Sequence, residues 1–171
     1  MTNPSQNNRA AAHLRLVPET GESARPHRWF CGACGAPGPA DATPHPFARG
    51  CEACGDGLLL EAADALAPRP GEAFLLVDAA LTVRSLSPAA VDLLAVAPEE
   101  AIGRPIAELL SAADAEAGPS GALPTAISAA AAGGEEEPTR MTVRPADVFG
   151  VRIPARIGVC GPPRAAVVVL D

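Results

Sequence analysis

Residues 73–94 read AFLLVDAALTVRSLSPAAVDLL and predict two strands followed by a helix. The apolar run Ala73–Val77 and the imperfect alternation over residues 81–86 are typical of a β-hairpin. Ser87 is expected to cap the helix, because its hydroxyl can accept a hydrogen bond from a free backbone N–H. Pro88 suits the first helical position, where no N–H is needed. The stretch therefore predicts a hairpin that leads directly into a helix.

Downstream of this stretch the pattern remains helical for a time and then changes to strands. Pro98, Glu99 and Glu100 begin another helical turn, followed by residues 102–110. Residues 122–132 predict a helix that ends at Gly133 and Gly134. Three strands are then expected at residues 139–144, 148–159 and 164–170. The order is two strands, several short helices and three strands, which indicates an α+β fold.

The segment AFLLVDAALTVRSLSPAAVDLLAVAPEEAIGRPIAELL resembles the first hairpin and helices of bacterial PAS sensor domains. Ser87 stands at the place of the usual Asn, and Ile102-Gly103-Arg104-Pro105 matches the family's next motif. The closing segments FGVRIPARIG and PRAAVVVLD are similar as well. The resemblance implies a PAS-like antiparallel five-stranded sheet with short helices over residues 72–171. A ferredoxin-like or other small α+β domain is the alternative.

The resemblance also implies a ligand-binding sensor or a dimerising module. A haem ligand is not expected, because the sequence has no His after His45, and the cysteine motif of photoactive flavin domains is missing. The lack of histidine and of a Gly-rich phosphate loop in this region predicts a protein that is not an enzyme. An unknown small ligand remains an open alternative. Cys160 is expected to be a small buried side chain rather than a reactive thiol.

Upstream of this domain, Cys31-Gly-Ala-Cys34 and Cys51-Glu-Ala-Cys54 are separated by sixteen residues. Two C-x-x-C pairs at this spacing are typical of a zinc ribbon, in which four thiolates bind one tetrahedral ion. Gly35 and Gly55 follow the second cysteine of each pair, and we expect both at positive φ. The sequence therefore predicts a structural zinc ion held by Cys31, Cys34, Cys51 and Cys54.

Other uses of these cysteines are less consistent with the pattern. A thioredoxin-like pair occurs singly beside a βαβ unit, and stable disulfides are rare in a reducing cytosol. An iron ion is chemically compatible with four thiolates. Because four cysteines fill a tetrahedron, His27 and His45 are expected to lie in surface loops. Trp29, Phe30 and Leu58–Leu60 are expected to pack around the metal rather than stack on a base.

The predicted organisation is a disordered tail (1–28), a zinc-ribbon-like module (29–60), a linker (61–71) and the PAS-like domain (72–171). The 171 residues carry a net charge of −7, and the acidic excess lies after residue 60. Such a surface repels phosphate, so nucleic acid is an unlikely partner of the second domain. Arg152, Arg156 and Arg164 are expected on a solvated strand face rather than in an anion site. No stretch resembles a signal peptide or a membrane span, which predicts a cytoplasmic protein without membrane contact.

These features together predict a non-enzymatic signalling protein that acts through another protein. The alternative is a transcription-associated factor whose ribbon contacts nucleic acid or RNA polymerase, for which Arg9, Arg15, Arg25 and Arg28 are the candidate contacts. PAS domains often dimerise through the segment before the first strand and the outer face of the sheet. A homodimer through residues 61–67 is therefore predicted, and Leu66→Asp is expected to dissociate it. A loop that closes the ribbon is the other interpretation of this segment.

Overall fold

The computed structural model describes residues 26–40, 42–113, 122–133 and 137–171. Of the tail predicted for residues 1–28, residues 1–25 lie outside the described part of the chain. His27 and Arg28 are not part of a tail, because they begin the first strand. This strand, β1 (His27–Cys31), pairs antiparallel with β2 (Leu59–Ala63) in a two-stranded sheet. The predicted ribbon therefore starts two residues earlier and ends three residues later than expected.

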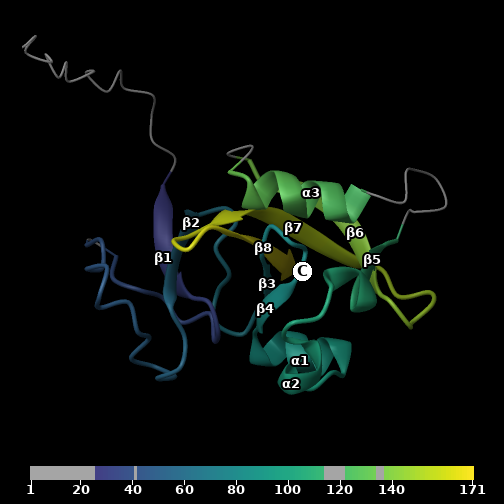
Figure 1. Ribbon diagram of the computed structural model, residues 1–171, viewed down its shortest axis with the longest axis horizontal. Helices are drawn as coiled ribbons and strands as arrows, with labels where there is room; N and C mark the ends of the chain where they lie inside the picture. The colour runs from purple at the N-terminus through teal and green to yellow at the C-terminus, as the bar shows by residue number, and fades with distance from the viewer. Residues whose placement is uncertain (1–25, 41, 114–121, 134–136) are drawn as a thin grey trace, which may run out of the picture.

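A larger antiparallel sheet forms the body of the molecule, with strand order β4-β3-β8-β7-β6-β5 (Figure 1). Its strands are β3 (Ala73–Val77), β4 (Val83–Leu86), β5 (Leu110–Ala112), β6 (Thr139–Pro145), β7 (Ile153–Cys160) and β8 (Ala165–Leu170). The described residues thus form six strands in this sheet, where five were predicted. The additional strand is the three-residue β5, which pairs with the end of β6.

The predicted hairpin and its helix are present. The helices are α1 (Pro88–Leu94), α2 (Pro98–Ala101), the 3₁₀ turn η1 (Ile106–Glu108) and α3 (Ala122–Ala131). Ser87 caps α1 as expected: its hydroxyl accepts a hydrogen bond from Ala90 N at 3.2 Å, and Pro88 occupies the first helical turn. β7 begins at Ile153 rather than at residue 148, because the chain turns at Gly150 with φ +82°.

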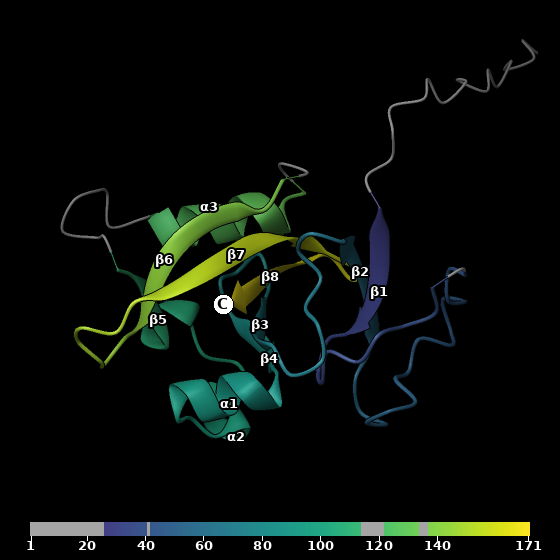
Figure 2. The same ribbon diagram turned by 180° about the vertical axis from the view of Figure 1, so that it is seen from behind.

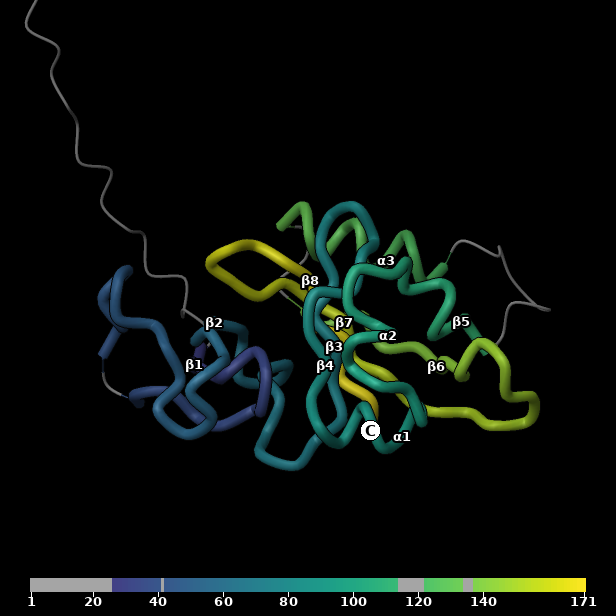
Figure 3. The backbone as a smooth tube through the Cα atoms, turned by 60° about the horizontal axis from the view of Figure 1, so that its bottom comes forward, coloured from purple at the N-terminus to yellow at the C-terminus, as the bar shows by residue number. Residues whose placement is uncertain are grey.

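The two faces of the large sheet are both covered, each by a different part of the chain. Alternate residues of β8, namely Ala166, Val168 and Leu170, belong to a core that includes the helices. The intervening Ala165, Val167 and Val169 belong to a second core. This second core contains residues of β1, β2 and the segment between β2 and β3. Figures 2 and 3 show β1 and β2 at one side of the sheet strands, away from α1 and α2.

The segment between β2 and β3 is packed against the sheet rather than acting as a free linker. Leu66 and Ala67 are 2% and 1% exposed. Leu66 lies directly over β7, where a Cβ placed on Gly158 would be 2.5 Å from Leu66 Cδ2. Leu66 is therefore buried by its own chain and is not exposed for the predicted dimer contact, and the homodimer itself stays a prediction.

No helix in the described part of the chain has the length and the apolar character needed to cross a bilayer.

Candidate metal centre

The four cysteines of the two C-x-x-C pairs converge on one point. Their Sγ atoms all lie within 4.8 Å of one another, and all four thiols are free. Cys31 Sγ is 3.6 Å from Cys54 Sγ, and Cys34 Sγ is 3.9 Å from Cys51 Sγ. Four thiolates around a tetrahedral ion with metal–sulfur bonds of about 2.3 Å would be separated by about 3.8 Å. The cluster has the chemistry and the spacing of a four-thiolate metal site.

Each pair sits on a tight turn that the following glycine makes feasible. Gly35 N donates to Cys31 O at 2.9 Å, and Gly55 N donates to Cys51 O at the same distance. The two glycines have φ values of +74° and +78°, as expected from their places after Cys34 and Cys54. The backbone N–H groups of Ala33 and Cys34 point at Cys31 Sγ, each at 3.4 Å. Such N–H donors stabilise metal-bound thiolates.

Gly57 is a site residue that the sequence argument missed. A Cβ at this position would lie 2.1 Å from Cys31 Sγ and 3.3 Å from Cys54 Sγ. The backbone of residue 57 therefore forms one wall of the metal site and has no space for a side chain. The sequence signal was the second glycine in Cys54-Gly-Asp-Gly57, two residues beyond the glycine that makes the turn.

The electrostatics of the cluster also favour a cation at its centre. Burial raises the pKa of the Cys31 thiol to about 12, so that thiol resists ionisation by itself. Backbone N–H groups of Asp56 and Gly57 lower the pKa of Cys54 to about 7. A bound divalent ion offsets the cost of burying several thiolates together, and its binding free energy becomes folding free energy. Four cysteine sulfurs occupy all four positions of a tetrahedral ion, so no coordination position is open to water or substrate. This favours a structural rather than a catalytic ion.

The two histidines near the cysteines lie outside the cluster, as predicted. His27 is exposed, but it lies on strand β1 rather than in the loop that was expected. His45 is exposed in the loop between the cysteine pairs, where its Nδ1 accepts a hydrogen bond from Phe47 N at 3.3 Å and its ring lies 5.6 Å from that of Phe47.

The aromatic residues beside the cysteines divide between two faces of β1. Trp29 packs with Cys31, Cys51 and Leu59 around the metal site, which agrees with the prediction. Phe30 and Leu60 instead face the large sheet, and the Phe30 ring meets Phe74 edge-on at a centroid distance of 6.0 Å. Leu58 is 45% exposed and contributes to neither core. The alternation of strand side chains explains the division, because adjacent residues of β1 point to opposite faces.

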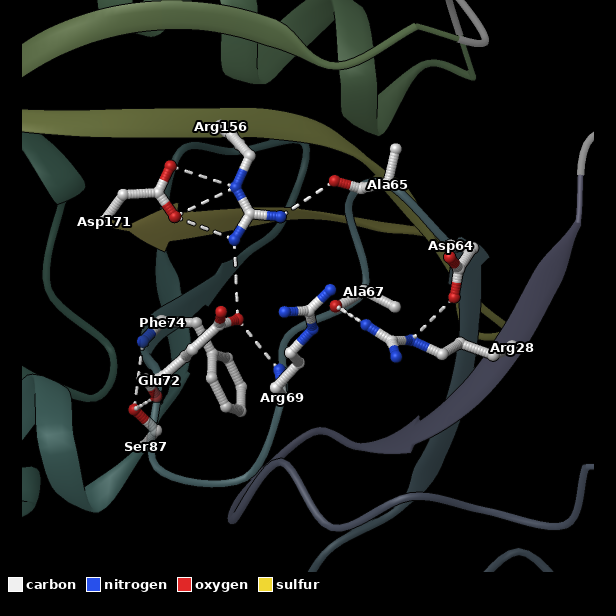
Figure 4. Close-up of polar contacts among 10 residues, drawn as sticks. All are labelled: Arg28, Asp64, Ala65, Ala67, Arg69, Glu72, Phe74, Ser87, Arg156 and Asp171. Atoms are coloured by element: carbon white, nitrogen blue, oxygen red, sulfur yellow. Dashed lines mark hydrogen bonds and ion pairs between the residues drawn. The ribbon is translucent and has the colours of Figure 1, made fainter.

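A seam of polar contacts joins the segment between β2 and β3 to both sheets (Figure 4). Arg28 donates to Ala67 O at 2.5 Å and pairs with Asp64 at 3.4 Å. Arg156 donates to Asp171 at 2.8 Å and to Ala65 O at 2.8 Å, and its Nη2 lies 3.4 Å from Glu72 Oε2. The prediction that Arg156 lies on a solvated face is wrong, because its side chain is only 13% exposed.

Further hydrogen bonds connect the ribbon to the turn between β7 and β8. Glu61 N donates to Gly161 O at 2.6 Å, and Gly161 N donates back to Glu61 O at 3.0 Å. Arg49 stacks over Trp29 and donates to Pro162 O at 3.0 Å. Near this turn, Arg164 donates to Ala132 O beyond the end of α3 at 3.2 Å. Cys160 is 2% exposed in the second core, and burial raises its pKa to about 12, as expected for an unreactive thiol.

Comparisons with known proteins show no similarity that assigns a family. No family model matches the chain, and a search of curated proteins found no match.

Proposed function

We propose that this chain is a non-enzymatic regulatory protein in which a PAS-like domain is combined with a ribbon that holds one structural zinc ion. The observation that carries the proposal is the arrangement of four thiols at tetrahedral spacing, directly beside a strand that packs on the sheet. The order of hairpin, short helices and three further strands supports the PAS-like part. Zinc suits four thiolates without redox chemistry, and a site filled by protein ligands supports folding rather than catalysis.

The output of such a protein passes through contact with another protein. The loop between β6 and β7 offers a surface for this contact, because Val148, Phe149 and Val151 are 44%, 83% and 40% exposed. Exposed apolar clusters of this kind mark interaction sites on soluble domains. Arg144 lies over the Phe149 ring, 4.9 Å from its centroid, and adds a positive charge to the same surface.

The experiment that tests the proposal combines metal analysis with partner binding. The protein purified without a tag is expected to contain one equivalent of zinc and to lack visible absorption. Iron with a coloured spectrum would contradict the zinc assignment. The Phe149→Ala variant is expected to lose a stoichiometric protein partner while it retains zinc and its circular dichroism. Leu93→Ala, at a 45% exposed position on α1, is the control and should keep the partner.

The alternative function, a ribbon that binds nucleic acid, receives less support. Arg28 and Arg49 are engaged within the chain, and Trp29 is only 7% exposed, so none of them presents a free stacking or phosphate contact. Arg9, Arg15 and Arg25 lie outside the described residues. Affinity for single-stranded or duplex nucleic acid that falls steeply with salt would restore this alternative.

A further inference from the structure

The outer face of the large sheet is covered by the ribbon and by the segment that follows it. Phe74 and Leu76 of β3 and Val167 and Val169 of β8 point to this face, and all four are at most 7% exposed. Their cover consists of Phe30 on β1, Leu60 and Ala62 on β2, and Leu66 and Ala67 after β2. The burial of this face therefore depends on Phe30, next to Cys31, and on the strand and segment that follow the second cysteine pair.

The cover is continuous in sequence with the cysteine cluster. Phe30 precedes Cys31, and Leu60 lies in the strand that follows the second cysteine pair. A module of this size buries too little apolar surface to fold alone, so its structure depends on the bound ion. By contrast, the helix side of the sheet has its own larger core, which contains Leu75, Val83, Ile127 and Val168 and no residue of the ribbon. Loss of the metal should release the cover and leave the sheet and helices folded.

The uncovered face would be largely apolar. Its charged member is Arg156 of β7, which lies across from Val169 and is paired within its own chain with Asp171 and Glu72. Phe74, Leu76, Val167 and Val169 carry no charge, and the charge of Arg156 is offset by Asp171 and Glu72, so this face does not select an acidic or a basic partner. The same face of a second copy can bury this surface from water. A two-fold contact uses one patch on both copies and requires only that the patch is complementary to itself. A ribbon exchanged between two copies could not cover this face in the metal-free protein, because the ribbon itself needs the metal to fold.

We infer that the ribbon is a metal-held cap on a self-association surface, and that zinc keeps the protein monomeric. Loss of zinc uncovers the outer face of β3 and β8, and two copies then pack these faces together. The inference rests on the proposed structural zinc ion and adds a response to zinc availability. Because zinc binding and dimerisation are thermodynamically linked, dimerisation must weaken zinc binding by the same factor by which zinc weakens dimerisation.

The test compares the full-length chain with one equivalent of zinc and after zinc removal by EDTA under reducing conditions. Sedimentation velocity is expected to show one copy with zinc and two copies without it, with the far-UV signal of the sheet retained. The self-association constant should rise by about 100-fold. A metal-free protein that stays monomeric, loses its sheet signal or forms unlimited aggregates overturns the inference. If the purified protein holds no zinc, the proposed function fails instead.

A variant separates release of the cover from loss of the metal itself. Phe30→Ala removes the ring that meets Phe74 and leaves the four cysteines in place, so the zinc-loaded variant is expected to dimerise. Phe47→Ala is the matched control, because Phe47 is in the same module and 94% exposed, and this variant should stay monomeric. A monomeric Phe30→Ala protein, with its zinc retained, would contradict the role of the cover.

The buried thiol of Cys160 reports on the face directly. It belongs to the covered core and should be protected from iodoacetamide in the zinc-loaded protein. After zinc removal, peptide mapping should find Cys160 modified at dilutions that favour the monomer and protected again at higher protein concentration. Modification that does not depend on concentration would overturn the dimer contact.

Discussion

Gly57 is the residue at which the metal site leaves the least space. Gly57→Ala would place a methyl group 2.1 Å from Cys31 Sγ, and the sulfur cannot stay in the cluster at that distance. We expect zinc affinity to fall by about 10- to 100-fold, the range seen when groups around metal ligands are disturbed. Competition with a chromogenic chelator measures this change. Gly50→Ala is the control, because a Cβ at that position meets nothing within 4 Å, and equal losses in both variants would contradict the explanation.

Ser87 is a buried polar residue with every hydrogen-bonding group used. Its hydroxyl accepts from Phe74 N at 3.0 Å and from Ala90 N at 3.2 Å, and it donates to Glu72 O at 3.0 Å. Ser87→Ala leaves these backbone groups without a partner at a position 1% exposed, and should lower the free energy of unfolding by about 1–3 kcal/mol. Urea denaturation measures this loss. The neighbouring Ser85→Ala, at a partly exposed position, should change stability much less.

At the scale of elements, the segment from β2 to β3 acts as a strap across the sheet. Leu66→Ala removes a buried side chain that packs on Gly158, and should destabilise the protein by about 2–5 kcal/mol. Because Leu66 also belongs to the cover of the outer face, the zinc-loaded variant should self-associate more readily than the unmodified protein. Thermal unfolding and sedimentation measure the two properties. A stable Leu66→Ala protein would mean that the strap is dispensable.

The two sheets are expected to unfold together in the zinc-loaded protein. They share the core formed by Phe30, Leu60, Phe74 and Val167, so neither can open without exposing the other's apolar surface. The chain has a single tryptophan, Trp29, whose fluorescence reports on the ribbon, whereas far-UV circular dichroism is dominated by the large sheet and the helices. The two signals should give coincident urea transitions.

Phe30→Ala is expected to separate these transitions, with the fluorescence change at lower urea. If the fluorescence and circular dichroism transitions of the unmodified protein occurred at different urea concentrations, the two sheets would be independent modules. Coincident transitions in Phe30→Ala would likewise contradict the expected result.

At the scale of the whole molecule, the cysteine site is coupled to the stability of the large sheet through a shared core. Residues 61–71 were predicted to be a linker that separates the ribbon from the later domain. The shared core changes that expectation: Cys34→Ser should release the ribbon and also lower the stability of the remaining domain. The helix-side core is the reason that this domain should still fold.

The local pattern of the sequence determined much of this protein. Cysteine spacing predicted which four thiols come together, and Ser87-Pro88 predicted the start of α1, because both depend on residues close in the chain. The runs AFLLV and AAVVVL contain no polar residue, and every residue in β3 and β8 is buried. Such runs indicate a strand covered on both faces, so the sequence held evidence that something must cover the outer face.

Only the tertiary structure decided what that cover is. Phe30, Leu60 and Leu66 could each have packed around the metal, faced solvent or met a second chain, since strand alternation assigns a residue to a face without naming its neighbour. Gly57 and Cys31 are twenty-six residues apart in the sequence. Their contact depends on how the turns that carry the two C-x-x-C pairs approach each other. Contacts between distant segments follow from the summed packing of the whole chain, and no local pattern records them.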